Sequence, residues 1–365
     1  MRPRETWIWG RDRLLGPGNS RLHRFLADRG RQLGLGKWAL ALLVLAVAWS
    51  WRDVPGNWWD AARGNRPLLA ARSWYYNLAR VEPDLIAKVD ADVLVIDFAK
   101  FEGKVPLTAA EVAAIKTGPS GKRRLVIAYF SIGEAEEFRF YWQPEWKAKP
   151  PTWDAGENCA WPKAHMVRFW QGDWKDTIIR GPNAYLKQII AAGFDGVYLD
   201  RVDVYEHQKD GHLDLRREMI GLVTELAATA RSLKPGFLVI PQNAEDLLRE
   251  RAYRRVIDGL GKESLLYGGE ATDQRNKARE ISSAMRGIKA LLWDWKPVFA
   301  VEYVTTAELG KAAAKELRRL GVVPTFQHRS LDGSNPFDPS VVRPPGSDAG
   351  TPEFIAANCK DKKWW

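Results

Sequence analysis

Carboxylates recur at the ends of short apolar runs in this sequence of 365 residues. In "GFDGVYLDRVDVYE" (193–206), an apolar run is followed by Asp200, Asp203 and Glu206 within seven positions. A lone acid in such a place commonly caps the next helix or pairs with an arginine. Acids that crowd together raise one another's pKa, and a carboxyl with a raised pKa can serve as a general acid. The pattern therefore predicts acid–base chemistry where several of these ends meet.

The elements that must position these acids are eight apolar runs rich in β-branched residues. Their near-continuous hydrophobicity is typical of parallel strands covered on both faces. The runs cover residues 73–78, 93–98, 125–134, 196–200, 237–243, 256–263, 298–304 and 322–328. Helical patterns lie between them, over residues 107–116, 183–193, 213–236, 275–293 and 305–321, the last opening with a capping box from Thr305 to Glu308.

Eight strands that alternate with helices predict a (β/α)8 barrel, the TIM-barrel class of α/β fold. A doubly wound open sheet is the second interpretation, but no GxGxxG motif follows the first run. A barrel's active site is built at the carboxyl ends of its strands, so the polar side chains that end the runs should converge there. These are Asp97, Glu134, Asp200, Gln242, Asn243, Glu263, Glu302 and Gln327, with Asp203 and Tyr303 beside them.

Composition predicts three parts of the chain. Residues 1–51 form a basic leader with an apolar segment, residues 52–328 the barrel, and residues 329–365 a tail that contains Pro, Gly and Ser. Residues 135–182 interrupt the barrel with a Trp- and Pro-rich insertion. Aromatic faces stack on the C–H surfaces of sugars, so we expect Trp142 and Trp170 of this insertion to bind carbohydrate.

The leader predicts export. "WALALLVLAVAWSW" (38–51) is an unbroken apolar segment behind a strongly basic region. It is shorter than the about 20 residues that a membrane span needs, and it fits the apolar part of a secretory signal. A signal cleaved after "AVA" (46–48) and an uncleaved membrane anchor are both open, and a buried core helix is the weaker alternative because the segment has no polar face. The bulk of the chain is expected outside the cytoplasm.

Charge and cysteine content narrow the function class. The formal net charge is +10, but +6 of it lies in residues 1–37, which leaves about +4 for the rest and argues against nucleic-acid binding. In an oxidising compartment, Cys159 and Cys359 could pair or remain free thiols. The five histidines are scattered and no CxxC motif occurs, so we expect neither a metal site nor a cofactor.

Paired carboxylates without a metal cluster or a Ser-His or Cys-His pair are typical of glycoside hydrolysis. One acid protonates the leaving oxygen, and the second acts as nucleophile or activates water. The alternatives are a non-catalytic carbohydrate-binding barrel for cell-envelope or biofilm polysaccharide, and a different hydrolase or deacetylase. A binding module needs stacking aromatics rather than two poised acids, which favours the hydrolase.

A family resemblance covers about residues 70–330. It is carried by "VIAYFSIGEAEEFRFYW", "GFDGVYLDRVDVYE", "IPQN", "DGLGKESLLYG" and "VEYV". Together these resemble the endo-α-1,4-polygalactosaminidase-like glycoside hydrolases, in the branch of extracellular glycosidases of the Thermotoga and Methanocaldococcus type. The resemblance implies a TIM-barrel glycosidase acting on α-1,4-linked galactosamine polymers. Polygalactosaminidases proper tend to have "NE", then Cys or an aromatic residue, where this chain has "GKESLLY", so the chain departs from them at one strand.

The resemblance implies that Asp200, the strand-four aspartate, and Glu263, the strand-six glutamate, are the catalytic pair. Cations have no evident place among the strand-end motifs, and cleavage needs only two acids. The surplus of negative charge therefore predicts a cationic amino-sugar substrate. Lys262 could lower the pKa of Glu263 unless it faces away. The residues expected to bind the polysaccharide are Asp97, Glu134, Asp203, Gln242, Asn243, Glu302, Tyr303, Trp142 and Trp170.

Overall fold

The computed structural model describes residues 66–101, 103–338 and 352–359. The chain divides into two compact units, Met1–Trp59 and Asp60–Trp365, and all of the described residues belong to the second. The predictions for the leader, residues 1–51, therefore lie outside the described residues. Within the described ranges, no helix combines the length and the apolar character needed to cross a membrane.

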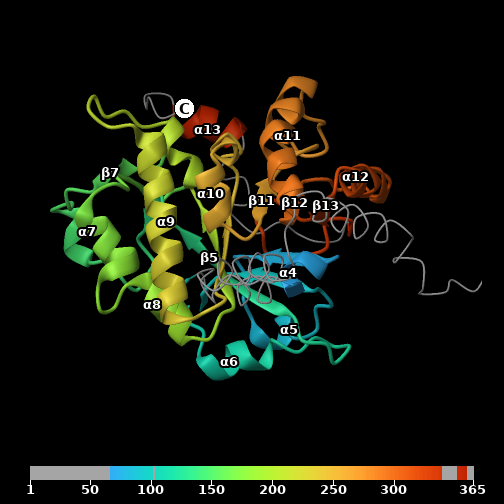
Figure 1. Ribbon diagram of the computed structural model, residues 1–365, viewed down its shortest axis with the longest axis horizontal. Coiled ribbons are helices and arrows are strands. Elements are labelled where there is room, and N and C mark those ends of the chain that lie inside the picture. The colour runs from blue at the N-terminus through green and yellow to red at the C-terminus, as the bar shows by residue number, and fades with distance from the viewer. Residues whose placement is uncertain (1–65, 102, 339–351, 360–365) are drawn as a thin grey trace, which may run out of the picture. The chain divides into compact units, whose positions relative to one another are not determined.

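Eight parallel strands form the centre of the second unit (Figure 1). Each lies within one of the eight predicted runs. Five are hydrogen-bonded in the order β1 (Trp74–Asn77), β2 (Val93–Ile96), β5 (Leu125–Ser131), β9 (Gly196–Asp200) and β10 (Leu238–Pro241). Three more follow in the order β11 (Leu260–Glu263), β12 (Val298–Glu302) and β13 (Val322–Phe326).

Two contacts join these two sets of strands into a ring. A parallel bridge between Gln242 and Gly261 links β10 to β11. On the other side, the indole N–H of Trp74 in β1 donates to the carbonyl of Val323 in β13 at 3.1 Å. The order of the strands around the ring is their order in the sequence, as in a (β/α)8 barrel. The predicted fold class is confirmed.

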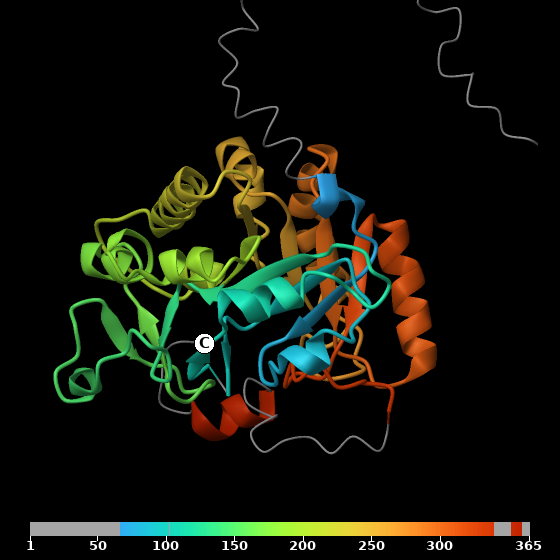
Figure 2. The same ribbon diagram turned by 90° about the horizontal axis from the view of Figure 1, so that it is seen from below.

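Helices connect the strands and pack around them (Figure 1). All five predicted helical patterns contain one. α4 (Arg66–Ala70) and α13 (Pro352–Asn358) lie at opposite ends of the barrel (Figure 2). The helices between the strands are α5 (Pro83–Ile86), α6 (Ala109–Ala114), α7 (Gly172–Lys175), α8 (Tyr185–Ala191), α9 (Leu215–Leu233), α10 (Arg251–Val256), α11 (Ala278–Trp293) and α12 (Ala307–Arg319).

The start of α12 differs from the prediction by one residue. The hydroxyl oxygen of Thr306 accepts from the backbone N–H of Leu309 at 3.3 Å, so Thr306 caps the helix. The hydroxyl of Thr305 instead donates to Asp273 at 2.5 Å. The predicted capping box from Thr305 to Glu308 is therefore wrong.

Alternate residues of the strands fill the barrel interior. Trp74, Tyr76, Tyr198 and Phe299 pack there, with ring centroids 5.2–6.2 Å apart. Side chains alternate between the two faces of a strand, so this register also decides which residues at the strand ends point inward. At the cavity end, the inward register includes Tyr76, Asp97, Tyr129, Asp200, Gln242, Glu263 and Tyr303.

The insertion forms a small antiparallel sheet of β6 (Glu134–Glu136), β8 (Ala164–Val167) and β7 (Asp154–Glu157), in that order. A disulfide between Cys159 and Cys359 ties the loop between β7 and β8 to the end of α13, so the structure forms the pair that the sequence left open. The remaining elements are the hairpin of β3 (Ala99–Lys100) and β4 (Val105–Pro106) and the short helices η1 (Pro144–Lys147), η2 (Asp176–Arg180), η3 (Val202–Glu206) and η4 (Leu247–Arg249).

Candidate active site

A cavity of about 460 Å³ opens at the carboxyl ends of the barrel strands. Glu302, Gln327, Trp142 and Trp170, which were expected in the site, are not among its lining residues. The other predicted site residues do line it, so the structure brings most of the predicted site together. The predicted residues that do line the cavity are Asp97, Glu134, Asp200, Asp203, Gln242, Asn243, Glu263 and Tyr303.

Asp200 is the last residue of β9 and is held from two sides. The hydroxyl of Tyr129 donates to its Oδ2 at 2.7 Å, and the backbone N–H of Arg201 donates to its Oδ1 at 2.7 Å. Burial raises the pKa of Asp200 to about 7, against the opposing effects of the Arg201 charge and the Tyr129 hydrogen bond. Asp200 can therefore carry a proton near neutral pH.

Glu263 is the last residue of β11 and receives two neutral donors. The amide of Gln242 donates to its Oε2 at 2.8 Å, and the hydroxyl of Tyr303 donates to its Oε1 at 2.6 Å. Gln242 is itself oriented by the hydroxyl of Tyr76, which donates to its Oε1 at 3.1 Å. The negative charge of Glu263 is one of the contributions that raise the pKa of Asp200, so the two acids share one electrostatic environment.

Three tyrosines that point into the barrel place their hydroxyls between the apolar core and the cavity. Tyr76, Tyr129 and Tyr303 are buried as part of the barrel interior, and each hydroxyl reaches a catalytic candidate or the amide that positions it. Burial raises the pKa of all three phenols well above the ordinary value. The hydroxyls therefore remain protonated and act as hydrogen-bond donors.

Lys262 faces away from Glu263. Its Nζ lies 2.8 Å from Oε1 of Glu245 and also donates to Oδ1 of Asn243 at 3.1 Å. The same Asn243 oxygen accepts from the backbone N–H of Glu263 at 3.1 Å, so Asn243 holds the end of β11. Asp203 lies in η3, and its negative charge also contributes to the raised pKa of Asp200.

The acids on the other side of the cavity are paired with arginines. Arg139 donates to both oxygens of Asp97, at 2.7 and 2.8 Å, and to Glu136 at 2.5 Å. The side chain of Arg139 is 1% exposed, that of Asp97 5% and that of Glu136 13%. Asp97 also accepts from the backbone N–H of Ala99 at 2.8 Å. These contacts fix the Asp97 carboxylate in the cavity wall.

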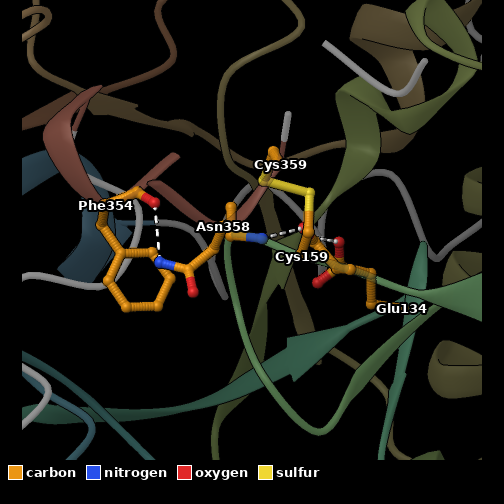
Figure 3. The surroundings of a disulfide bond; sticks show 7 residues. Glu134, Cys159, Phe354, Asn358 and Cys359 are labelled. Atoms are coloured by element: carbon orange, nitrogen blue, oxygen red, sulfur yellow. Dashed lines mark hydrogen bonds between the residues drawn. A yellow bond between two sulfur atoms is a disulfide. The ribbon is translucent and has the colours of Figure 1, made fainter. Parts of the chain in front are cut away.

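Glu134 is paired in the same way. Nε of Arg201 lies 2.8 Å from its Oε1, and the side-chain amide of Asn158 donates to the same oxygen at 2.7 Å. Asn158 directly precedes Cys159, so the disulfide lies beside Glu134 (Figure 3). The bond to α13 thus holds the loop that supports this wall of the cavity.

The expectation of uncompensated negative charge needs correction. Arginine and lysine side chains share the cavity lining with the acids. Arg139 and Lys163 come from the insertion and Arg329 from the tail, which the strand-end motifs do not include, whereas Arg201 directly follows Asp200. Asp200, Asp203 and Glu263 differ from the other acids, because none of them forms an ion pair with a residue that the structure describes. The cations of the lining are Lys104, Arg139, Lys163, Arg201 and Arg329.

Glu302 is fully buried on the other face of β12 and holds a loop. Its two oxygens accept from the backbone N–H groups of Leu265, Leu266 and Tyr267 at 2.6–3.1 Å. These residues lie just beyond Glu263 and Ser264, so Glu302 holds the chain that follows the second acid. Glu302 was expected to bind substrate, but it lies outside the cavity lining, because strand alternation points Glu302 outward and Tyr303 inward.

The two predicted sugar-binding tryptophans also lie elsewhere. Trp142 packs in the core of the insertion, with ring centroids 5.3 Å from Trp146 and 4.7 Å from His165. Trp170 packs against Phe169 at 5.1 Å. The tryptophan that lines the cavity is Trp161, which is 42% exposed, and the motif "CAWP" that joins it to Cys159 was its signal in the sequence.

The sequence of this site and barrel matches a known enzyme family. Residues 54–341 match the profile of glycoside-hydrolase family GH114. The chain belongs to this family. It is a glycoside hydrolase, as the resemblance predicted.

Two relatives are similar to much of this chain. An uncharacterized protein of Deinococcus radiodurans is 37% identical over 244 residues, which cover 66% of this chain and 74% of the relative. An uncharacterized protein of Methanocaldococcus jannaschii is 34% identical over 266 residues, which cover 71% of this chain and 72% of the relative.

Two solved structures support the barrel fold of this GH114 protein. The glycoside hydrolase domain of PelA from Pseudomonas aeruginosa has a TM-score of 0.56 at 20% identity, covering 72% of this chain and 97% of that one. Ega3 of Aspergillus fumigatus, in complex with galactosamine, has a TM-score of 0.52 at 20% identity, covering 72% of this chain and 93% of that one.

Proposed function

We propose that this GH114 enzyme hydrolyses an amino-sugar polysaccharide of the galactosamine type, with Asp200 and Glu263 as its catalytic carboxylates. The observation that carries the proposal is their shared setting. They end separate strands, β9 and β11, line one cavity, and are held by neutral donors rather than by arginines or lysines. Two such acids are what glycosidic cleavage requires.

The chemistry assigns each acid one task. One carboxyl gives its proton to the glycosidic oxygen as the bond from that oxygen to the anomeric carbon breaks. The other carboxylate has one of two roles. It can take a proton from a water molecule that attacks the anomeric carbon directly. Alternatively, it attacks the anomeric carbon itself and forms a covalent glycosyl–enzyme bond, which water then breaks as the first carboxylate, now a base, takes the proton of that water. Tyr129, Tyr303 and Gln242 orient the carboxylates and stabilise their negative charge.

The substrate class follows from the acids that have no ion-pair partner among the described residues. Asp200, Asp203 and Glu263 face the cavity together, and an ammonium group on the sugar would offset their charge. The similarity to Ega3, whose structure contains galactosamine, supports the same class.

The test measures new reducing ends from a panel of purified polysaccharides. We expect release from galactosamine-containing polymers by the wild type, and none above background by Asp200→Asn or Glu263→Gln. Asp176→Asn and Glu308→Gln, which change exposed acids, are the matched controls and should retain activity. Binding of the polymer without any release would favour the non-catalytic carbohydrate-binding barrel.

Export is the second part of the proposal. The basic leader and the apolar segment 38–51 support a location outside the cytoplasm, by secretion or by an N-terminal anchor. Two reporters can be fused after residue 60, one that works only outside the cytoplasm and one that works only inside it. We expect only the first to be active. Equal activity of a reporter that works only in the cytoplasm would contradict this.

A further inference from the structure

Two neighbouring tryptophans are almost completely exposed at the end of α11. Trp293, the last residue of the helix, is 86% exposed, and Trp295 is 81% exposed. The chain between them is fixed, because Asp294 pairs with Arg254 of α10 at 2.6 Å and the N–H of Trp295 donates to the carbonyl of Leu292 at 3.0 Å. Exposed aromatic surface of this size on a rigid support indicates an interaction site.

These tryptophans lie at the end of the barrel opposite the cavity. α11 and the other outer helices run from the carboxyl ends of the strands back to their amino ends, and β12 starts directly after Trp295, at Val298. α4 lies at the same end (Figure 2). A Cβ at Gly259 would lie 2.9 Å from the carbonyl oxygen of Pro297 and 3.7 Å from Leu68 of α4, so α4 and the Trp295 loop flank the same position.

The sequence before α4 connects this end to the apolar segment. Residues 52–65 separate the segment 38–51 from Arg66, the first residue of α4. A short stretch of chain therefore joins the apolar segment 38–51 to α4, at the end of the barrel that contains Trp293 and Trp295.

Exposed arginines lie at the ends of the two helices beside α11. Arg255 at the end of α10 and Arg318 and Arg319 at the end of α12 are exposed, and these helices flank α11. The contact between the ends of α12 and α11 is direct, since a Cβ at Gly321 would lie 3.4 Å from Leu292. Exposed cations around amphipathic tryptophans are the combination that anionic lipid headgroups attract.

We propose that this end of the barrel is a membrane-contacting surface, made of Trp293, Trp295, Arg255, Arg318 and Arg319, that rests on an anionic phospholipid bilayer. The indoles lie at the headgroup level, where an aromatic body with one N–H donor is stable. The cavity then faces away from the lipid, toward polymer outside the membrane. This inference is independent of the hydrolytic reaction and of the identity of the sugar.

The experiment measures contact between this surface and lipid with a fluorescent label on the full-length protein. Both cysteines are disulfide-bonded, so an introduced cysteine is the only free thiol. Lys289→Cys places a polarity-sensitive fluorophore on exposed surface one helical turn before Trp293, and Lys149→Cys places the same label on the insertion as the matched control. The labelled proteins are reconstituted with vesicles of phosphatidylcholine, with or without phosphatidylglycerol.

With phosphatidylglycerol, the label at position 289 should shift its emission to the blue and be quenched by a nitroxide lipid, while the label at position 149 stays unchanged. The double change Trp293→Ser and Trp295→Ser should abolish the shift while the protein still sediments with the vesicles through its leader. Salt should weaken the shift. A label at position 289 that stays in water, a shift that survives the double change, or a shift caused by soluble polysaccharide without lipid would each overturn the proposal.

Discussion

The two walls of the cavity hold their acids in different ways. On the wall built from β2 and the insertion, Asp97, Glu134 and Glu136 are paired with Arg139 or Arg201 at 2.5–2.8 Å. On the wall built from β9 and β11, the carboxylates accept from phenols, an amide and backbone N–H groups. Both walls are rich in acids, but only on the second do the carboxylates form no ion pair with a described residue.

This difference separates structural acids from reactive ones. A carboxylate held by a buried guanidinium already has a counter-charge, although burial still raises the pKa of Glu136 above its ordinary value. A carboxylate held by neutral donors can still gain from a proton or from a cationic group of the substrate. For Asp200, burial raises the pKa to about 7. The comparison therefore predicts that variants on the two walls fail in different ways, one in catalysis and the other in stability.

The largest expected effect is on catalysis by the acids that end β9 and β11. Asp200→Asn and Glu263→Gln should each lower kcat by about 10³-fold or more, because each acid carries a distinct step. Circular dichroism and melting temperature should stay near those of the wild type. Added azide should restore turnover to small-residue variants at these positions and identify the step each acid serves. Full activity in Asp200→Asn would remove it from the catalytic pair.

The next effect is on stability at the first wall. Arg139→Met leaves Asp97 and Glu136 buried without their cation, and breaking a buried ion pair costs about 3–5 kcal/mol of unfolding free energy. Adding Asp97→Asn and Glu136→Gln to Arg139→Met should recover part of that loss. Denaturant unfolding measures both. If Arg139→Met alone is as stable as the wild type, this ion pairing contributes little to the free energy of unfolding.

The sequence predicted the barrel well because its signals were local. Eight apolar runs with strong strand character each became a strand, and glycine or threonine marked several helix ends. The one-residue error at Thr305 arose from a tertiary contact, the hydrogen bond to Asp273, which local spacing does not contain.

The site was predicted less completely, for two physical reasons. β12 is buried on both faces, so its hydrophobic pattern could not show that Tyr303 points inward and Glu302 outward. Arg139 and Trp161 come from the insertion, whose path over the barrel depends on its own sheet and on the disulfide to α13. Counting acids at strand ends therefore found the catalytic candidates but missed the cations that neutralise the others.

An intermediate effect is expected for the phenol that donates to Glu263. Tyr303→Phe removes one hydrogen bond to a charged group, worth about 1.5–3 kcal/mol, and should lower kcat/KM by about 10- to 100-fold. Tyr185→Phe is a matched control, because Tyr185 is a buried tyrosine outside the lining of this cavity. An equal loss in both variants would indicate general damage to the core rather than positioning of Glu263.

A smaller effect concerns stability against pH. Burial raises the pKa of Asp200 to about 7, above its ordinary value, so the folded protein binds this proton more tightly than the unfolded chain. The contribution of Asp200 to stability should therefore fall as pH rises from about 4 to 7 and stay constant above that. The melting temperature of Asp200→Asn should rise relative to wild type across this window, by a few °C. Asp176→Asn should show no such trend.

The smallest expected effect tests the charge of the substrate. In a Glu263→Gln background, which binds without cleaving, affinity should fall as a galactosamine polymer becomes more acetylated, because acetylation removes the ammonium groups that face Asp200 and Asp203. A single carboxylate–ammonium contact at 4 Å is worth about 1 kcal/mol in water, or about fivefold in affinity, and salt should weaken it. Adding Asp203→Asn should flatten the dependence on acetylation, since Asp203 supplies charge to the cavity without a place in the cleavage step. Changing Asp97 instead should alter stability more than this preference, because Arg139 already neutralises it. Tighter binding at higher acetylation would overturn the cationic substrate and leave the two-acid mechanism standing.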